Sequence, residues 1–148
     1  MQLIPAPAGV LEVDALWQQN NPNDPNTDTV ALLCHPNPLF DGTMNNKVVT
    51  TMYRFARDSG MHVVRFNFRG VGQSTGEHDY AEGEVVDAMT VLQWIAEQTN
   101  ARKLWLGGFS FGGYVTARAA EQVLEASHIW DVSDFEITKI ALIAPSVE

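Results

Sequence analysis

The segment Gly108-Phe109-Ser110-Phe111-Gly112 has the pattern G-x-S-x-G, with one serine held between two glycines. The apolar run Leu104-Trp105-Leu106 leads into it, and a run typical of a helix follows from Tyr114. That context predicts a sharp strand-to-helix turn that exposes the serine hydroxyl. Only glycine fits where the two backbones nearly touch, two residues before and after the serine. Ser110 is therefore the candidate nucleophile, on a strained backbone. The alternative is an ordinary glycine-rich turn.

A serine nucleophile also needs a base, an acid that orients the base, and N–H donors for the oxyanion. The backbone N–H of Phe111 is a predicted donor, because it opens the helix. The second donor is expected within residues 35–42, which read HPNPLFDG. Two of these residues are prolines without an N–H, so the donor is Asn37 or Leu39. Alternatively, the prolines only shape a surface loop.

The elements that must position these residues alternate along the chain. Strands are expected at residues 30–34, 62–68, 103–107 and 139–144, and helices at 46–59, 82–98 and 111–126, with a further strand at 10–17 pairing antiparallel at an edge. This alternation predicts an α/β fold, a three-layer doubly wound and mostly parallel sheet with helices on both faces. Chemistry is then expected in the loops after the carboxyl ends of the strands.

Three segments occur in order: HPNPLFDGTM at 35–44, FNFRGVGQSTG at 66–76 and GGFSFGG at 107–113. With them the sequence resembles the α/β-hydrolase superfamily, and more closely a group of small uncharacterised bacterial α/β-hydrolases. The resemblance covers roughly residues 10–147. It implies a Ser-His-Asp hydrolase of esterase or thioesterase type that acts on a small acyl ester and needs no cofactor. It implies no particular substrate.

The family order is serine, then acid, then histidine, each after its own strand. No acid after Ser110 follows a further strand, so the acid and the histidine are expected beyond residue 148. We therefore expect residues 1–148 to be a single α/β-hydrolase domain that is incomplete at its C-terminus and has no inserted cap domain. The strand at 139–144 would then be an apolar edge strand, prone to aggregation.

The four histidines have different expected roles. His35 is expected to shape its loop and line the pocket, and is a weaker candidate for the base. His62 is expected to be structural and His128 to be a solvated loop residue. His78 lies on the cleft side, where it could line the site, although a surface role is favoured. Two aromatic residues, Phe40 and Phe109, are further candidates for the pocket lining, although core positions are the alternative.

Composition excludes several other functions. Asp plus Glu number 18 against 9 Lys plus Arg, and this net charge of −9 argues against nucleic-acid binding and against docking on anionic membranes. The single cysteine, Cys34, and the scattered histidines predict no metal site. Gly70, Gly72 and Gly76 miss the dinucleotide spacing by one position, and no phosphate loop occurs.

These observations favour a cytoplasmic enzyme without a cofactor, whose partner is a small-molecule acyl substrate; a homodimer stays open. The principal alternative is a non-catalytic fragment or interaction module that keeps the strand-to-helix turn as a scaffold. The reactivity of Ser110 discriminates between the two.

Overall fold

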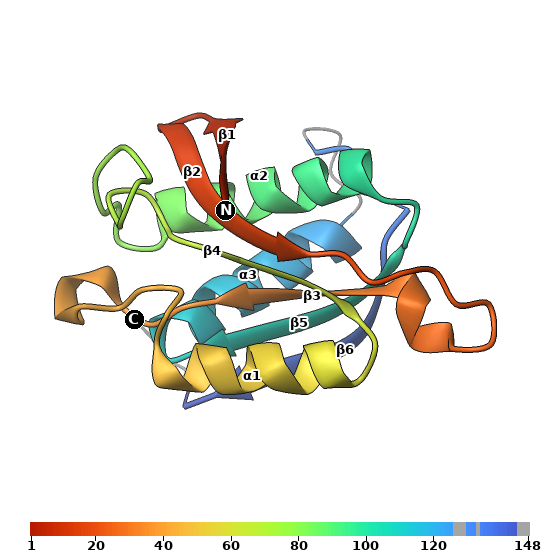
Figure 1. Ribbon diagram of the computed structural model, residues 1–148. Coiled ribbons are helices and arrows are strands. Elements are labelled where there is room, and N and C mark those ends of the chain that lie inside the picture. Colours follow the sequence, from red (N-terminus) through yellow and green to blue (C-terminus); the bar gives the residue numbers. More distant parts are fainter. Residues whose placement is uncertain (126–129, 133, 145–148) are drawn as a thin grey trace.

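The computed structural model describes residues 1–125, 130–132 and 134–144, arranged around one six-stranded sheet (Figure 1). The strand order is β1-β2-β4-β3-β5-β6. The strands are β1 (Gln2–Ala6), β2 (Gly9–Leu16), β3 (Thr29–Cys34), β4 (His62–Phe66), β5 (Lys103–Phe109) and β6 (Glu136–Ile143). The four strands from β4 to β6 are mutually parallel, whereas β1 and β2 are antiparallel at one edge. The predicted α/β fold class is confirmed.

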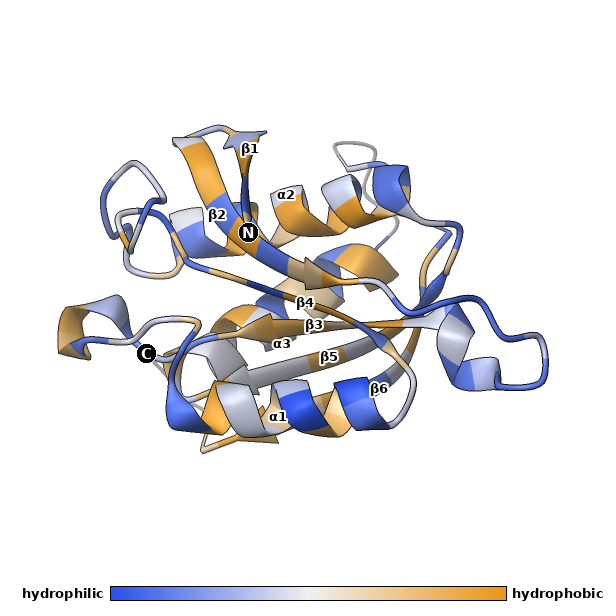
Figure 2. Cartoon of the chain, viewed as in Figure 1, coloured by the Kyte–Doolittle hydropathy of each residue, from blue (hydrophilic) through white to orange (hydrophobic). Residues whose placement is uncertain are grey.

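Helices cover both faces of the sheet. Helix α1 (Lys47–Asp58) packs with β3 and β4 on one face, and its apolar residues form a small core with Leu33 and Val63. Helices α2 (Glu82–Gln98) and α3 (Phe111–Leu124) cover the other face and enclose the larger core. Figure 2 shows hydrophobic residues along β3 and α2, and hydrophilic residues along the segment 17–28. None of the described helices is long and apolar enough to cross a bilayer.

Strand β3 lies at the centre because its sequence is apolar along its whole length. All six of its residues are buried, as expected for a parallel strand covered on both faces. Its register places Cys34 beside Gly108 of β5, so the two strands end together. The segments that follow β3, β4 and β5 therefore meet at one edge of the sheet, which we call the carboxyl edge.

The structure differs from the sequence prediction at several strands, one of which, β6, begins at Glu136 rather than at 139. Strand β1 was not expected; it pairs with β2 at the sheet's edge, where Pro5 opposite Val10 is tolerated. Strand β4 ends at Phe66 rather than 68, and the next two residues turn toward the carboxyl edge. Strand β6 is an edge strand within the described residues, and Ile140 and Leu142 are partly exposed along it.

Candidate active site

Ser110 lies in the turn between β5 and α3 with φ 55° and ψ −118°. A side chain pays a strain energy of roughly 1–3 kcal/mol in such a conformation. A β-carbon on Gly108 would overlap the carbonyl oxygen of Gly112, and one on Gly112 would overlap the carbonyl oxygens of Cys34 and His35. The predicted geometry of the turn is therefore present, and the second glycine is required by the end of β3 rather than by β5.

Two backbone N–H groups around Ser110 donate to carbonyl oxygens of the protein, and a third has no acceptor in the described structure. The Ser110 N–H donates to the Ile143 carbonyl of β6 at 2.9 Å, and the Gly113 N–H donates to the Ser110 carbonyl at 2.9 Å. The Phe111 N–H, which opens α3, has no acceptor among the described residues. An unused N–H at a helix N-terminus is suited to bind a developing negative charge.

The loop after β3 distinguishes between the two candidates for the second donor. The Leu39 N–H donates to Oδ1 of Asn37 at 2.9 Å, and the N–H groups of Phe40 and Gly42 both donate to the Asn37 carbonyl at 3.0 Å. Leu39 is therefore occupied by the turn that holds the loop. The Asn37 N–H has no acceptor within the described part of the chain, so the geometry favours Asn37 over Leu39.

His35 is fully buried and neither lines open space nor acts as a base. Its Nδ1 lies 2.7 Å from the Pro36 carbonyl oxygen, and its Nε2 accepts from the Phe68 N–H at 3.0 Å. Burial lowers the pKa of His35 to about 4, so the ring is neutral near pH 7. The pocket-lining expectation for His35 is corrected: the ring ties the loop after β3 to the segment after β4, as the loop-shaping role requires.

The aromatic residues expected near the pocket lie in three different environments. Phe40 is 83% exposed, so its side chain stands on the surface of the described structure. Phe109 packs against the core between the sheet and α1. Phe111 is buried, with its ring edge-on to Phe68 at 5.7 Å between centroids. These placements do not support a pocket lined by Phe40 and Phe109.

His78 was expected to have a surface role, and the structure buries most of its side chain. Its side chain is only 11% exposed, which contradicts a surface role. Its Nδ1 lies 3.3 Å from Oε2 of the fully buried Glu84, and its ring lies against that of Phe111 with centroids 5.4 Å apart. His62 is structural as expected, since its Nδ1 accepts from the Gln18 N–H and its Nε2 lies 2.9 Å from the Thr27 carbonyl oxygen. His128 lies outside the described residues.

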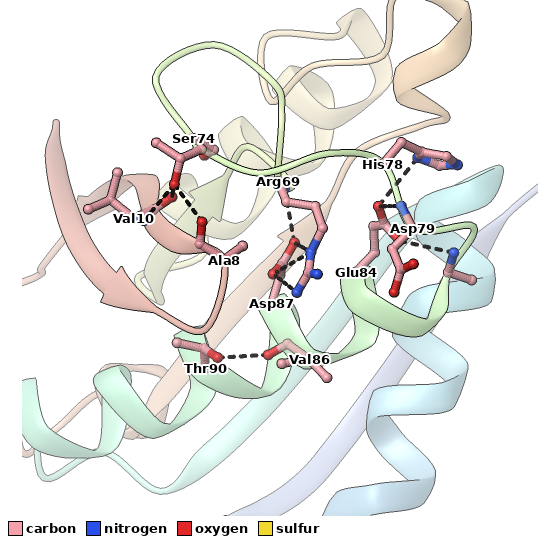
Figure 3. A network of polar contacts seen from close by, with 12 residues as sticks. Ala8, Val10, Arg69, Ser74, His78, Asp79, Glu84, Val86, Asp87 and Thr90 are labelled. Carbon is pink, nitrogen blue, oxygen red and sulfur yellow. Dashed lines mark hydrogen bonds and ion pairs between the residues drawn. The ribbon is translucent and has the colours of Figure 1, made fainter.

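Buried polar groups fix the segments at the carboxyl edge (Figure 3). The carboxylate of Asp87 accepts from the backbone N–H of Arg69 at 2.9 Å and from its guanidinium at 2.8 Å. Further along the same segment, the Ser74 hydroxyl donates to the Asn67 carbonyl at 2.6 Å. The buried roles of Asp87 and Ser74 were not expected from the sequence, because their partners are 18 and 7 positions away along the chain.

No group of three potential metal ligands occurs within residues 1–125, 130–132 and 134–144. Cys34 is buried, and burial raises the pKa of its thiol to about 12. The thiol is therefore protonated and behaves as an apolar side chain. The residues at the carboxyl edge offer a hydroxyl and backbone N–H donors.

Comparison with known proteins identifies the family. The protein-family model for the alpha/beta hydrolase fold matches residues 32–143 of the chain. The chain belongs to the α/β-hydrolase fold family. Among solved structures, this α/β hydrolase is similar to an alpha-beta serine hydrolase homologue from Coxiella burnetii, with 43% identity, a TM-score of 0.75 and coverage of 82% of this chain and 56% of that one.

Two further relatives place the chain more closely. An α/β serine hydrolase without a lid from Xanthomonas campestris is 37% identical, with a TM-score of 0.77 and coverage of 95% of this chain and 68% of that one. An uncharacterised protein of Rickettsia prowazekii is 42% identical over 114 residues, which are 76% of this chain and 46% of the relative. This α/β hydrolase thus spans about half the length of the Rickettsia and Coxiella proteins.

Proposed function

We propose that the protein is a serine hydrolase that cleaves small acyl esters or thioesters through an acyl-enzyme on Ser110. One observation carries the proposal. Ser110 occupies a strained turn that two glycines make sterically feasible, next to the unused N–H of Phe111. Such costly backbone conformations cluster at active sites, where the surrounding structure holds them.

In the proposed reaction, Oγ of Ser110 attacks the carbonyl carbon of the ester. The N–H groups of Phe111 and Asn37 stabilise the oxyanion of the tetrahedral intermediate, and its collapse expels the alcohol or thiol and leaves an acyl-serine. Water then hydrolyses this ester and restores the serine. A histidine must accept the Ser110 proton and return it to the leaving group, and an acid must orient that histidine.

Relatives support the hydrolytic class without fixing a substrate. The Xanthomonas relative is described as a serine hydrolase, and a lysophosphatidylserine lipase from Danio rerio is 28% identical over 112 residues. These residues cover 76% of this chain and 28% of the lipase. Because the shared part is a minor fraction of the lipase, its substrate does not transfer, whereas ester chemistry at the shared turn is a reasonable proposal.

The proposal is tested by stopped-flow hydrolysis of p-nitrophenyl butyrate by the gene product at its native length. We expect a burst of p-nitrophenol equal to the enzyme concentration, and we expect Ser110→Ala to abolish it. Ser59→Ala is the matched control, because Ser59 caps the far end of α1 and should keep the full burst. A folded protein that releases no p-nitrophenol, in a burst or in the steady state, would contradict the proposal and favour the non-catalytic interaction module.

A further inference from the structure

The loop that carries Asn37 is anchored at both ends to the segment that follows β4. At its start, Nε2 of His35 accepts from the Phe68 N–H at 3.0 Å. At its end, the Met44 N–H donates to Oδ1 of Asn67 at 2.9 Å. Both anchoring side chains, those of His35 and Asn67, are buried. The loop is therefore fixed in place by the rest of the fold.

The hydrogen bonds of the His35 ring define which nitrogen carries the hydrogen. Because Nε2 accepts from a backbone N–H, the neutral ring carries its hydrogen on Nδ1. Burial lowers the pKa of His35 to about 4, which keeps the ring neutral near pH 7. Nδ1 lies 2.7 Å from the carbonyl oxygen of Pro36, so the ring donates to this oxygen. One side chain thus connects the backbone N–H of Phe68 to the backbone carbonyl of Pro36.

The Pro36 carbonyl belongs to the same peptide unit as the Asn37 N–H. This peptide bond is trans and planar, so the carbonyl and the N–H point in opposite directions. The carbonyl is directed at the His35 ring and also packs against Gly42, where an added β-carbon would overlap the Pro36 oxygen. The Asn37 N–H therefore points away from the buried ring, and it has no acceptor among the described residues.

This peptide unit lies close to the turn that carries Ser110. A β-carbon on Gly112 would overlap the His35 carbonyl oxygen, so the backbone of His35 packs against the first turn of α3. Asn37 is two residues from that contact, and Phe111, which offers the other unused N–H, is next to Gly112. An oxyanion hole depends on donors whose direction is set before the reaction. The direction of the Asn37 donor is set by its own peptide plane.

We propose that His35 is a positioning residue for acyl transfer: by holding the Pro36 carbonyl, it aims the Asn37 N–H at the oxyanion of the tetrahedral intermediate. His35 acts through this peptide unit and does not touch the reacting atoms. The inference rests on the proposed function of Ser110. It concerns the rate of acylation rather than substrate affinity, because the oxyanion forms only after the serine attacks.

The test compares the rate of the p-nitrophenyl butyrate burst in protein of native length with two replacements of His35. A Gln side chain reaches the position of Nε2, whereas an Asn side chain places its amide nitrogen near the position of Nδ1. His35→Gln should slow acylation roughly tenfold or more with KM little changed, because the donor to Pro36 is lost. His35→Asn, which keeps that donor, should recover part of the rate. Ser74→Ala is the control: it removes buried hydrogen bonds at the same edge and should keep the wild-type rate.

A double-mutant cycle separates action through the Asn37 N–H from a general effect on the fold. Asn37 has a φ of −56°, which suits proline, so Asn37→Pro removes the N–H without requiring a change in φ. It should slow acylation roughly a hundredfold, whereas Asn37→Ala, which keeps the N–H, should slow it less. In the Asn37→Pro background, His35→Gln should cost about twofold at most, because the donor that His35 aims is already missing.

The outcomes distinguish this inference from the proposed function. An unchanged burst rate in folded His35→Gln, or an undiminished effect of His35→Gln in the Asn37→Pro background, would overturn the inference alone. A wild-type protein that releases no p-nitrophenol would overturn both. If His35→Gln does not fold, ¹⁵N NMR of the wild-type histidines decides. We expect the hydrogen of His35 on Nδ1, and a hydrogen on Nε2 would leave Pro36 without its donor and overturn the inference.

Discussion

The carboxyl edge of the sheet and the opposite edge, where the parallel strands begin, differ in how much backbone strain they contain. Within residues 1–125, 130–132 and 134–144, five non-glycine residues have positive φ: Asp41, Tyr80, Ala81, Ser110 and Ala144. Each lies in a segment that follows the carboxyl end of β3, β4, β5 or β6. At the opposite edge, the described turn with positive φ uses Gly60, where the conformation costs little. Backbone strain is therefore concentrated in the segments that follow the carboxyl ends of the strands, where active sites of such sheets are expected.

The polar interactions show why the strained edge persists. Glu84 holds the segment containing Tyr80 and Ala81 through two backbone N–H groups, and His35 joins the segments after β3 and β4. The opposite edge is also held by contacts between distant residues, since Nδ1 of His62 accepts from the Gln18 N–H at 2.9 Å and its Nε2 lies 2.9 Å from the Thr27 carbonyl oxygen. Hydrogen bonds to the buried side chains of Glu84 and His35 therefore offset the strain at the carboxyl edge, whereas the turn at Gly60 has little strain to offset.

The sharpest way to break the carboxyl edge is to add a methyl group where two backbones meet. Gly108→Ala should destabilise the protein by about 3 kcal/mol or more, because the new carbon overlaps the Gly112 carbonyl and the backbone must move. Gly107→Ala is the matched control, since its new carbon meets side chains, the nearest being the Trp105 ring at 2.8 Å. Urea unfolding of both variants measures the difference, and equal losses would contradict the steric account.

Acid should weaken the carboxyl edge through His35. Its pKa is about 4 in the folded protein and near 6.5 when unfolded, so the unfolded chain binds the proton first as pH falls. The free energy of unfolding should drop by up to roughly 3 kcal/mol between pH 6.5 and 4, and no further from this group below pH 4.

The control for this acid effect is His35→Gln, which removes the group that titrates. Its stability curve should be flatter over this range, whereas His62, whose pKa is also lowered by burial, continues to contribute in both proteins. Urea titrations from pH 7 to 4 give both curves. Parallel curves for the two proteins would show that His35 is not the coupling group.

The strain at Ser110 should be measurable as a gain of stability when the side chain is removed. Ser110→Gly relieves the cost of φ 55° and should stabilise the fold by about 1 kcal/mol while abolishing the acyl-enzyme burst. Ser110→Ala keeps the β-carbon and should abolish the burst with little gain. Thermal unfolding compares the two variants, and equal stabilities would mean that the serine is not strained.

The smallest expected effect concerns strain away from the nucleophile. Ala81→Gly should stabilise the protein by less than about 1 kcal/mol, because relief at φ 86° is partly offset by the freedom that glycine gains when unfolded. The burst with p-nitrophenyl butyrate should be unchanged. A lost burst in a stable Ala81→Gly protein would instead assign the segment a direct part in acyl transfer.

The sequence predicts the parts of the molecule that are encoded locally. The apolar run of β3 and the pattern around Ser110 are local signals, and both the parallel sheet and the turn are present. The sequence does not show what depends on distant partners. The burial of His78 requires Glu84 on the following helix, and the environment of His35 requires the Phe68 N–H, 33 positions away. Strand β1 was missed because Pro5 argues against a strand unless that strand lies at an edge.

The central claim is that Ser110 is a nucleophile. The most direct measurement is intact mass spectrometry of the gene product at its native length after treatment with a fluorophosphonate, followed by peptide mapping. We expect one adduct, located on the peptide containing Ser110 and missing from Ser110→Ala. A folded protein that gains no adduct, or gains one on another residue, would contradict it.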